Sequence, residues 1–71
     1  MQTVYPNLDM EIQKRDISYS SLAKQIGLSK YAMYRRIVGR TDFKISEIVQ
    51  ICQVLDILDA SQLFLRLNTK T

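Results

Sequence analysis

The chain has 71 residues, of which 46% are hydrophobic and 24% are charged, and its formal net charge is +3. This length supports one domain with a small core and excludes a second domain. No apolar run approaches the ~20 residues of a membrane-spanning helix, and no basic N-terminal segment leads into an apolar one, so we expect a soluble, unsecreted protein. Because the chain has no His and a single Cys, disulfide frameworks and the common Cys/His zinc sites are excluded.

The positive charge is concentrated in the middle of the chain. Six basic residues and one acidic residue lie between Lys24 and Lys44, for a local net charge of +5, while the remaining four basic and six acidic residues give −2. A basic stretch of this kind is typical of a surface that faces nucleic acid, but a solvated charged face has the same pattern. Charge alone gives the two interpretations equal weight.

With only two Gly and one Pro, the sequence predicts helices joined by short connections. The first helix begins at Pro6 or Asn7 and ends near residues 15–16, and Leu8 and Ile12 form its apolar stripe. Ser18 is placed to cap a second helix, with Leu22 facing inward.

Gly27 can end the second helix with a positive φ, and Ser29 can cap a third helix two residues later. Because this connection is so short, the two helices should cross steeply. Met33 and Ile37 share one face of the third helix, which ends at Gly39. Three residues lie toward its opposite side: Tyr31, Tyr34 and Arg35.

A fourth helix is predicted after Phe43. Its apolar positions cover a face broad enough for packing on more than one side, which favours the central helix of the core: Ile45, Ile48, Ile51, Cys52 and Leu55. Beyond it, Asp59 or Ser61 can cap a last short helix, although the alternation of apolar residues over 63–67 fits a terminal strand equally well.

Residues 18–39 thus combine a capped helix, a glycine turn and a second capped helix with a basic and aromatic outer side. Ala23 is small where the two helices would touch, and Gly27 supplies the conformation of the turn. These constraints agree on a helix-turn-helix motif.

The segment Leu-Ala-Lys-Gln-Ile-Gly-Leu-Ser-Lys at 22–30, together with 34–43 and 45–48, resembles the phage-repressor family of helix-turn-helix proteins, the lambda repressor/Cro-like or XRE-type group. The likeness covers roughly 8–64 and is greatest to small phage or mobile-element regulators. It implies an all-α, compact five-helix DNA-binding domain over 1–71. It also implies a double-stranded DNA partner, a homodimer and a cytoplasmic, bacterial or phage-encoded protein, with a tail at 65–71 that is either flexible or dimer-forming.

Carried over residue by residue, the resemblance assigns DNA contacts in two groups. Base edges in the major groove would be contacted by Lys30, Tyr31, Tyr34 and Arg35. Phosphates would be contacted by Tyr19, Ser20, Arg40, Thr41 and Lys44. Arg36 stays undecided as a contact, since its stem can cover the core edge while its guanidinium reaches solvent or phosphate. Lys44 also replaces the usual capping Ser or Thr of the fourth helix, which removes about 1 kcal/mol unless Asp42 compensates.

The sequence therefore predicts a sequence-specific DNA-binding transcriptional regulator, a repressor that inserts its third helix in the major groove and self-associates through Leu63 to Leu67. The alternative is a protein-interaction module on the same fold, such as an antitoxin, antirepressor or adaptor, because fold alone does not decide function. We expect no enzymatic activity, catalytic residue, metal, cofactor, small-molecule ligand or membrane partner, because no nucleophile–base pair, metal cluster or glycine-rich phosphate loop is present in the sequence.

Overall fold

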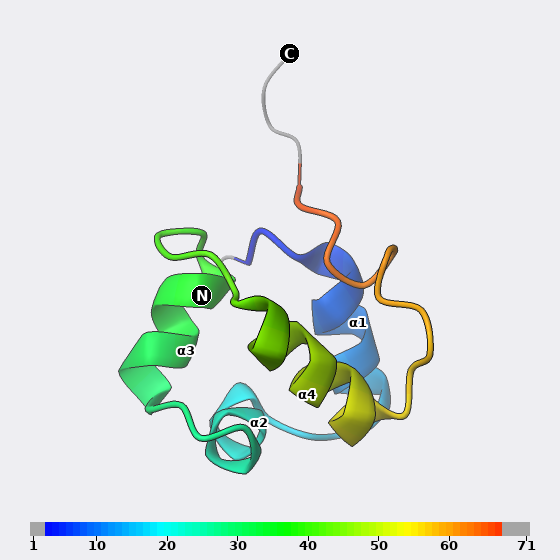
Figure 1. Ribbon diagram of the computed structural model, residues 1–71, viewed down its shortest axis with the longest axis horizontal. Helices are drawn as coiled ribbons and strands as arrows, with labels where there is room; N and C mark the ends of the chain where they lie inside the picture. The colour runs from blue at the N-terminus through cyan, green and yellow to red at the C-terminus, as the bar shows by residue number, and fades with distance from the viewer. Residues whose placement is uncertain (1–2, 68–71) are drawn as a thin grey trace.

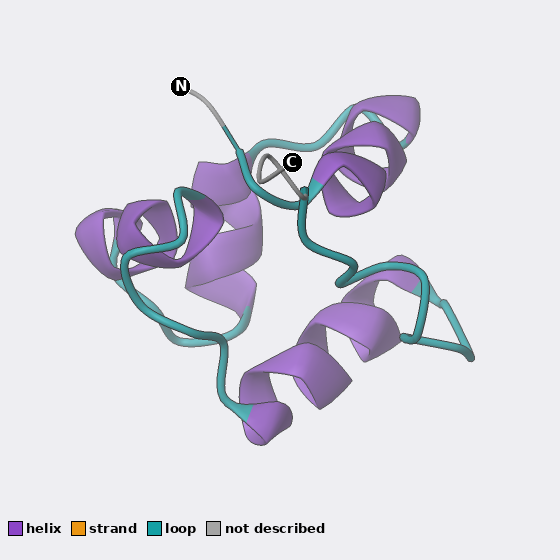
Figure 2. Cartoon of the chain, turned by 90° about the horizontal axis from the view of Figure 1, so that it is seen from above, coloured by secondary structure: helices purple, strands orange, loops and turns teal. Residues whose placement is uncertain are grey.

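The computed structural model describes residues 3–67 and contains four helices, α1 (Pro6–Lys14), α2 (Tyr19–Gln25), α3 (Lys30–Ile37) and α4 (Ile45–Leu55) (Figure 1). No strand is present in this range, as the view coloured by secondary structure in Figure 2 also shows. In Figure 1, α4 lies in front of α1, and α3 lies at the left of the view. The predicted all-α class is confirmed. None of the helices in the described range has the length and apolar character needed to cross a membrane.

Local signals set the ends of α2 and α3. The hydroxyl oxygens of Ser18 and Ser29 each accept a hydrogen bond from the backbone N–H three residues later, at 3.0 Å in both cases. Gly27 and Gly39 follow the two helices with φ of +80° and +87°, a backbone region that side chains with a Cβ rarely adopt. The predicted caps and terminating glycines are therefore confirmed.

One apolar core receives side chains from all four helices and from the segments at both ends of the described chain. Its buried members are Tyr5, Leu8, Ile12, Leu22, Ala23, Ile26, Met33, Ile37, Ile51, Leu55 and Leu63. At one edge of this core, Tyr5, Phe43 and Phe64 pack edge to face, with ring centroids 5.3 to 5.8 Å apart. Because α2 and α3 both contribute to this core, their crossing is fixed from inside.

The apolar face predicted for α4 is only partly buried. Ile51 and Leu55 are buried, but the side chain of Ile45 is 80% exposed and that of Val49 is 48% exposed. The sequence pattern overestimated the buried face because no neighbouring helix covers the outer side of α4 in the described chain. An apolar strip on this helix consequently remains at the surface.

The start of α4 is capped without a Ser or Thr. The side chain of Glu47, in the first turn, accepts a hydrogen bond from the backbone N–H of Lys44 at 2.9 Å. This is the half of a capping box that a glutamate can supply. Glu47 therefore compensates for the missing cap, whereas the carboxylate of Asp42 lies 3.4 Å from the guanidinium of Arg66.

The predicted fifth helix and terminal strand are both absent from residues 3–67. Residues 61–64 form a single turn, in which the N–H of Phe64 donates to the carbonyl of Ala60 at 3.3 Å, and the chain then continues without regular structure. A single turn without further intrahelical bonds does not propagate, because helix nucleation is unfavourable. Of the predicted tail at 65–71, residues 68–71 lie outside the described range.

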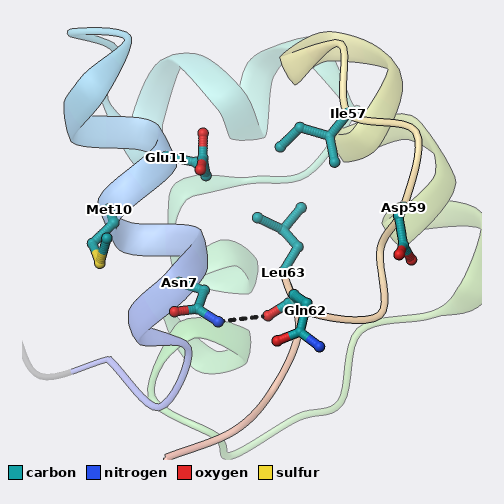
Figure 3. A pocket seen from close by; sticks show the side chains of 7 residues that line it. All are labelled: Asn7, Met10, Glu11, Ile57, Asp59, Gln62 and Leu63. Carbon is teal, nitrogen blue, oxygen red and sulfur yellow. Dashed lines mark hydrogen bonds between the residues drawn. The ribbon is translucent and has the colours of Figure 1, made fainter.

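The C-terminal segment is attached to the N-terminal part of the chain. The side chain of Asn7 donates to the carbonyl of Gln62 at 2.8 Å (Figure 3), and the N–H of Leu67 donates to the carbonyl of Val4 at 2.6 Å. Leu63, between these two points, is only 3% exposed. Its side chain belongs to the core, whereas Leu65 and Leu67 of the segment expected to self-associate are 50% and 48% exposed.

Candidate nucleic acid interface

The four residues predicted to contact bases lie on one side of α3. Lys30, Tyr31 and Tyr34 are exposed, with 66% of Tyr31 and 40% of Tyr34 accessible to solvent, and Arg35 is partly exposed. Their spacing of one, four and five positions from Lys30 places them on neighbouring turns of the same face. Since Met33 and Ile37 hold the other side of the helix in the core, this α3 face (Lys30, Tyr31, Tyr34 and Arg35) points outward.

Arg35 is held by contacts at two places. Its Nε–H donates to the hydroxyl oxygen of Thr41 at 3.2 Å, and its guanidinium carbon lies 5.8 Å from the centre of the Tyr31 ring. The second distance is within the range of a cation–π contact. The arginine is therefore oriented before any ligand binds.

The residues predicted to contact phosphate flank the α3 face on both sides. Ser20 is exposed in the first turn of α2, while Arg40 and Lys44 are exposed and Thr41 is partly exposed in the loop between α3 and α4. A shallow cavity of about 170 Å³ joins the start of α2 to α3. It is lined by Tyr19, Ser20, Lys30, Met33, Tyr34 and Ile37.

Tyr19 differs from the other members of this group because its hydroxyl is already engaged. The O–H donates to the carboxylate of Asp9 on α1 at 2.8 Å. Burial, reinforced by this bond and by the negative charge of Asp9, raises the pKa of Tyr19 well above its ordinary value, so the hydroxyl keeps its proton. The hydroxyl proton thus ties α2 to α1, and the ring lines the cavity between α2 and α3.

The guanidinium of Arg36 points into the molecule, contrary to the expectation that it reaches solvent or phosphate. Its Nε and Nη2 donate to the two carboxylate oxygens of Glu47 at 2.8 and 3.1 Å, and its Nη1 donates to the carbonyl of Ala32 at 3.0 Å. The exposed fractions are only 9% for Arg36 and 7% for Glu47. This fork joins α3 to α4 and accounts for a basic residue at a position that would otherwise be apolar.

Sequence reasoning missed Arg66, which lies beside the loop between α3 and α4. Its Nη1 is 3.4 Å from the carboxylate of Asp42, and its Nη2 donates to the carbonyl of Gly39 at 3.5 Å. Its guanidinium carbon also lies 5.7 Å from the centre of the Tyr5 ring. No spacing in the sequence indicates this approach, because it depends on the return of the C-terminal segment across the fold.

Two larger cavities lie away from the α3 face. One, of about 330 Å³, lies between α1 and the segment 57–63, with Glu11 and Asp59 among its lining residues (Figure 3). The other, of about 450 Å³, borders the outer side of α4 and is lined mainly by apolar side chains. Within the described range, no group of three or more metal-ligating side chains comes together.

Among known families, the model of the Cro/C1-type HTH DNA-binding domain matches residues 7–58, which cover the four helices except Pro6 at the start of α1. Neither the curated proteins nor the solved structures gave a match.

Proposed function

The chain belongs to the Cro/C1-type helix-turn-helix DNA-binding domain family, and from this premise we propose that it regulates transcription by placing α3 in the major groove of a specific duplex sequence. The observation that carries the proposal is the α3 face, an outward-facing group of two cationic and two aromatic side chains. Exposed polar and basic residues of α2 and of the loop after α3 flank this face.

We assign base reading to the α3 face. Lys30 and Arg35 can donate to O6 and N7 of guanine, and Tyr31 and Tyr34 can present a hydroxyl or a ring edge to neighbouring bases. Phosphate contacts fall to Ser20, Arg40, Thr41 and Lys44, with Tyr19 lining the cavity beside Ser20. We give Arg36 no part in this interface, because it is buried and each of its three nitrogens already donates to Glu47 or Ala32.

In this proposal the protein acts as a homodimer on a pseudo-palindrome, with half-sites about one helical turn apart. Since Leu63 is buried, we assign the dimer contact to the apolar outer side of α4 and the residues after it. Ile45 is 80%, Val49 48% and Leu58 102% exposed, and Val49 and Leu58 border the cavity of about 450 Å³. Such an apolar surface is typical of a protein contact.

The dimer is tested with Val49→Asp and Leu58→Asp. Either charge should convert the dimer to a monomer in sedimentation equilibrium, because it would be buried in the contact without a partner. Met10→Asp is the matched control, since Met10 is 62% exposed on α1. A dimer that survives both α4-side substitutions would remove this surface from the proposal.

DNA binding is tested by selecting duplexes from a random pool at moderate salt and titrating the selected duplex with salt. We expect a recurring two-fold symmetric sequence and a linear fall of log affinity with log salt concentration. No duplex binding at about 50 mM salt would reject the proposal and favour the alternative of a protein-interaction module. The apolar cavity beside α4 is the observation that favours that alternative.

Repression is the proposed outcome of binding, through occlusion of a promoter. A reporter gene with the selected sequence across its promoter should lose transcript when the protein is supplied. The same promoter with a scrambled sequence is the control. A rise in transcript would assign the protein to activation instead.

A further inference from the structure

We propose that Thr41 is a positioning residue for base recognition, which holds the guanidinium of Arg35 in the orientation that reads a base pair. This inference rests on the proposed function and deepens it. It gives Thr41 a second role beside a phosphate contact and makes the specificity at one base pair depend on a residue outside α3.

The guanidinium of Arg35 is fixed from two directions. The hydroxyl oxygen of Thr41, in the loop, accepts from Nε at 3.2 Å, and the ring of Tyr31, one turn earlier on α3, lies 5.8 Å from the guanidinium carbon. A long side chain with several rotatable bonds is thereby restricted to one region in front of the helix. This restriction lowers the entropy that binding would otherwise cost.

The backbone of Arg35 places Thr41 for this contact. The carbonyl of Arg35 accepts hydrogen bonds from the N–H of Arg40 at 2.8 Å and from the N–H of Thr41 at 3.2 Å. The positive φ of Gly39 turns the chain back toward α3 so that both bonds can form. One residue of α3 is therefore linked to Thr41 through both its main chain and its side chain.

The bond to Thr41 also determines which donors of Arg35 remain for DNA. A guanidinium carries one N–H on Nε and four on the two terminal nitrogens. With Nε engaged, the terminal edge formed by Nη1 and Nη2 can donate end-on to O6 and N7 of a guanine. Arg36 is a contrast on the same helix, because Glu47 and Ala32 accept from all three of its nitrogens.

Thr41 can serve the base reader and the DNA backbone together. Its hydroxyl oxygen accepts from Arg35, and its O–H remains able to donate to a phosphate oxygen. The side chain is β-branched, which restricts its χ1 and keeps the oxygen directed at Arg35. A phosphate seated at Thr41 would thus hold the orientation of the arginine.

The test compares Thr41→Val with Thr41→Ser on duplexes that carry each of the four base pairs at every position of the selected site. Arg35→Ala first identifies the position that Arg35 reads, as the one whose preference disappears. Thr41→Val keeps the branched shape without the hydroxyl, and it should reduce the preference at that position by about two- to tenfold, the range of one hydrogen bond. Thr41→Ser should restore the preference, because its hydroxyl can accept from Nε.

The Arg35→Ala background supplies the control for an indirect effect. Adding Thr41→Val there should leave the preference at that position unchanged, since no arginine remains to be oriented. If Thr41→Val weakens all duplexes by one common factor and leaves every preference intact, Thr41 contacts phosphate only and the inference is overturned. If the unmodified protein binds no duplex, the proposed function fails and this inference fails with it. The previous outcome overturns the inference alone, so the two failures are distinguishable.

Discussion

Arg36 and Glu47 form the buried ion pair that joins α3 to α4. Both residues are less than 10% exposed, and the two carboxylate oxygens accept from two nitrogens of the guanidinium. Removing one partner from such a pair costs more than the pair itself contributes, because the other charge stays buried without compensation. The position of the α3 face relative to the loop before α4 therefore depends on both residues.

We predict that Arg36→Ala lowers the free energy of unfolding by about 3 kcal/mol, measured by urea denaturation. This is most of the net folding stability of about 3–5 kcal/mol that is expected of a chain of this size. The double variant Arg36→Met, Glu47→Leu should recover part of the loss, since it leaves no buried charge. A double variant that is no more stable than Arg36→Ala would contradict this account.

The same pair predicts an acid-sensitive contribution to stability. Burial raises the pKa of Glu47, but hydrogen bonds from Arg36 and the Lys44 N–H, with the charges of both residues, outweigh it and hold this pKa below its ordinary value of 4.5. The folded state therefore binds this proton less tightly than the unfolded state. The contribution is complete above about pH 4.5 and is lost as the pH falls through the lower pKa of the folded state.

Unfolding free energies measured between about pH 5 and pH 3 should fall less steeply for Glu47→Gln than for the unmodified protein. Glu11→Gln is the control. The pKa of Glu11 is also lowered, chiefly by its hydrogen bond from Arg15, but that carboxylate lies at the surface, where solvent screens the interaction. Equal slopes for Glu47→Gln and the unmodified protein would show that this pair does not produce the acid sensitivity.

At the scale of elements, the two glycines that end α2 and α3 should differ in their tolerance of a side chain. A Cβ on Gly27 would meet no atom within 4 Å, so Gly27→Ala should cost only the strain of a positive φ, about 1–2 kcal/mol. A Cβ on Gly39 would also press on Val4 at 3.3 Å and displace the guanidinium of Arg66. We expect Gly39→Ala to cost more, about 2–3 kcal/mol.

Thermal denaturation of the two variants side by side measures this difference. Adding Arg66→Ala to Gly39→Ala removes one of the crowded groups and should bring the cost of the glycine substitution closer to that at Gly27. If Gly27→Ala proved as damaging as Gly39→Ala, backbone strain alone would account for both positions.

The features that were predicted well are those decided within a few residues of sequence. A serine hydroxyl that reaches the N–H three residues later, or a glycine that takes a positive φ, needs no distant partner, so Ser18, Ser29, Gly27 and Gly39 were identified in advance. The exposure of Ile45 depends instead on which segments pack against α4. No local pattern contains that information.

In the candidate site, too, the features set by local sequence were predicted and the contacts between distant segments were not. Helical spacing predicted that Tyr31, Tyr34 and Arg35 lie toward the outer side of the third helix, because the period of the helix fixes their directions. Lys30 joined this group through the family resemblance. The partner of Arg36 lies eleven residues away on α4, and the contact of Arg35 with Thr41 requires the chain to turn at Gly39. Spacing alone could not show that two adjacent arginines point to opposite environments.

At the scale of the whole molecule, the fold separates the cations near α3 from cations that are paired with carboxylates. The order of residues in the sequence shows this separation only in part. The charge of Arg36 is neutralised by Glu47 in the interior, which leaves Lys30, Arg35, Arg40 and Lys44 as cations on α3 and the loop after it. At the end of α1, Lys14 and Arg15 both pair with Glu11. A duplex on the α3 face would therefore meet the first group of cations, whereas the second group lies outside that face and outside the loop after α3.

This arrangement predicts that the salt dependence of duplex binding follows the position of the charges and not their total. Arg40→Gln with Lys44→Gln and, as a matched control, Lys14→Gln with Arg15→Gln each lower the formal net charge of the chain from +3 by two. The first pair should reduce the slope of log affinity against log salt by about 2 for each bound chain, and thus by about 4 for a dimer on its site. The control pair should leave the slope unchanged, because its cations lie at the end of α1, outside the α3 face and the loop after α3, and both pair with Glu11. Equal reductions of the slope for both pairs would mean that binding responds to net charge alone. A reduction of the slope by only about 2 at saturation would mean that a single chain occupies the site.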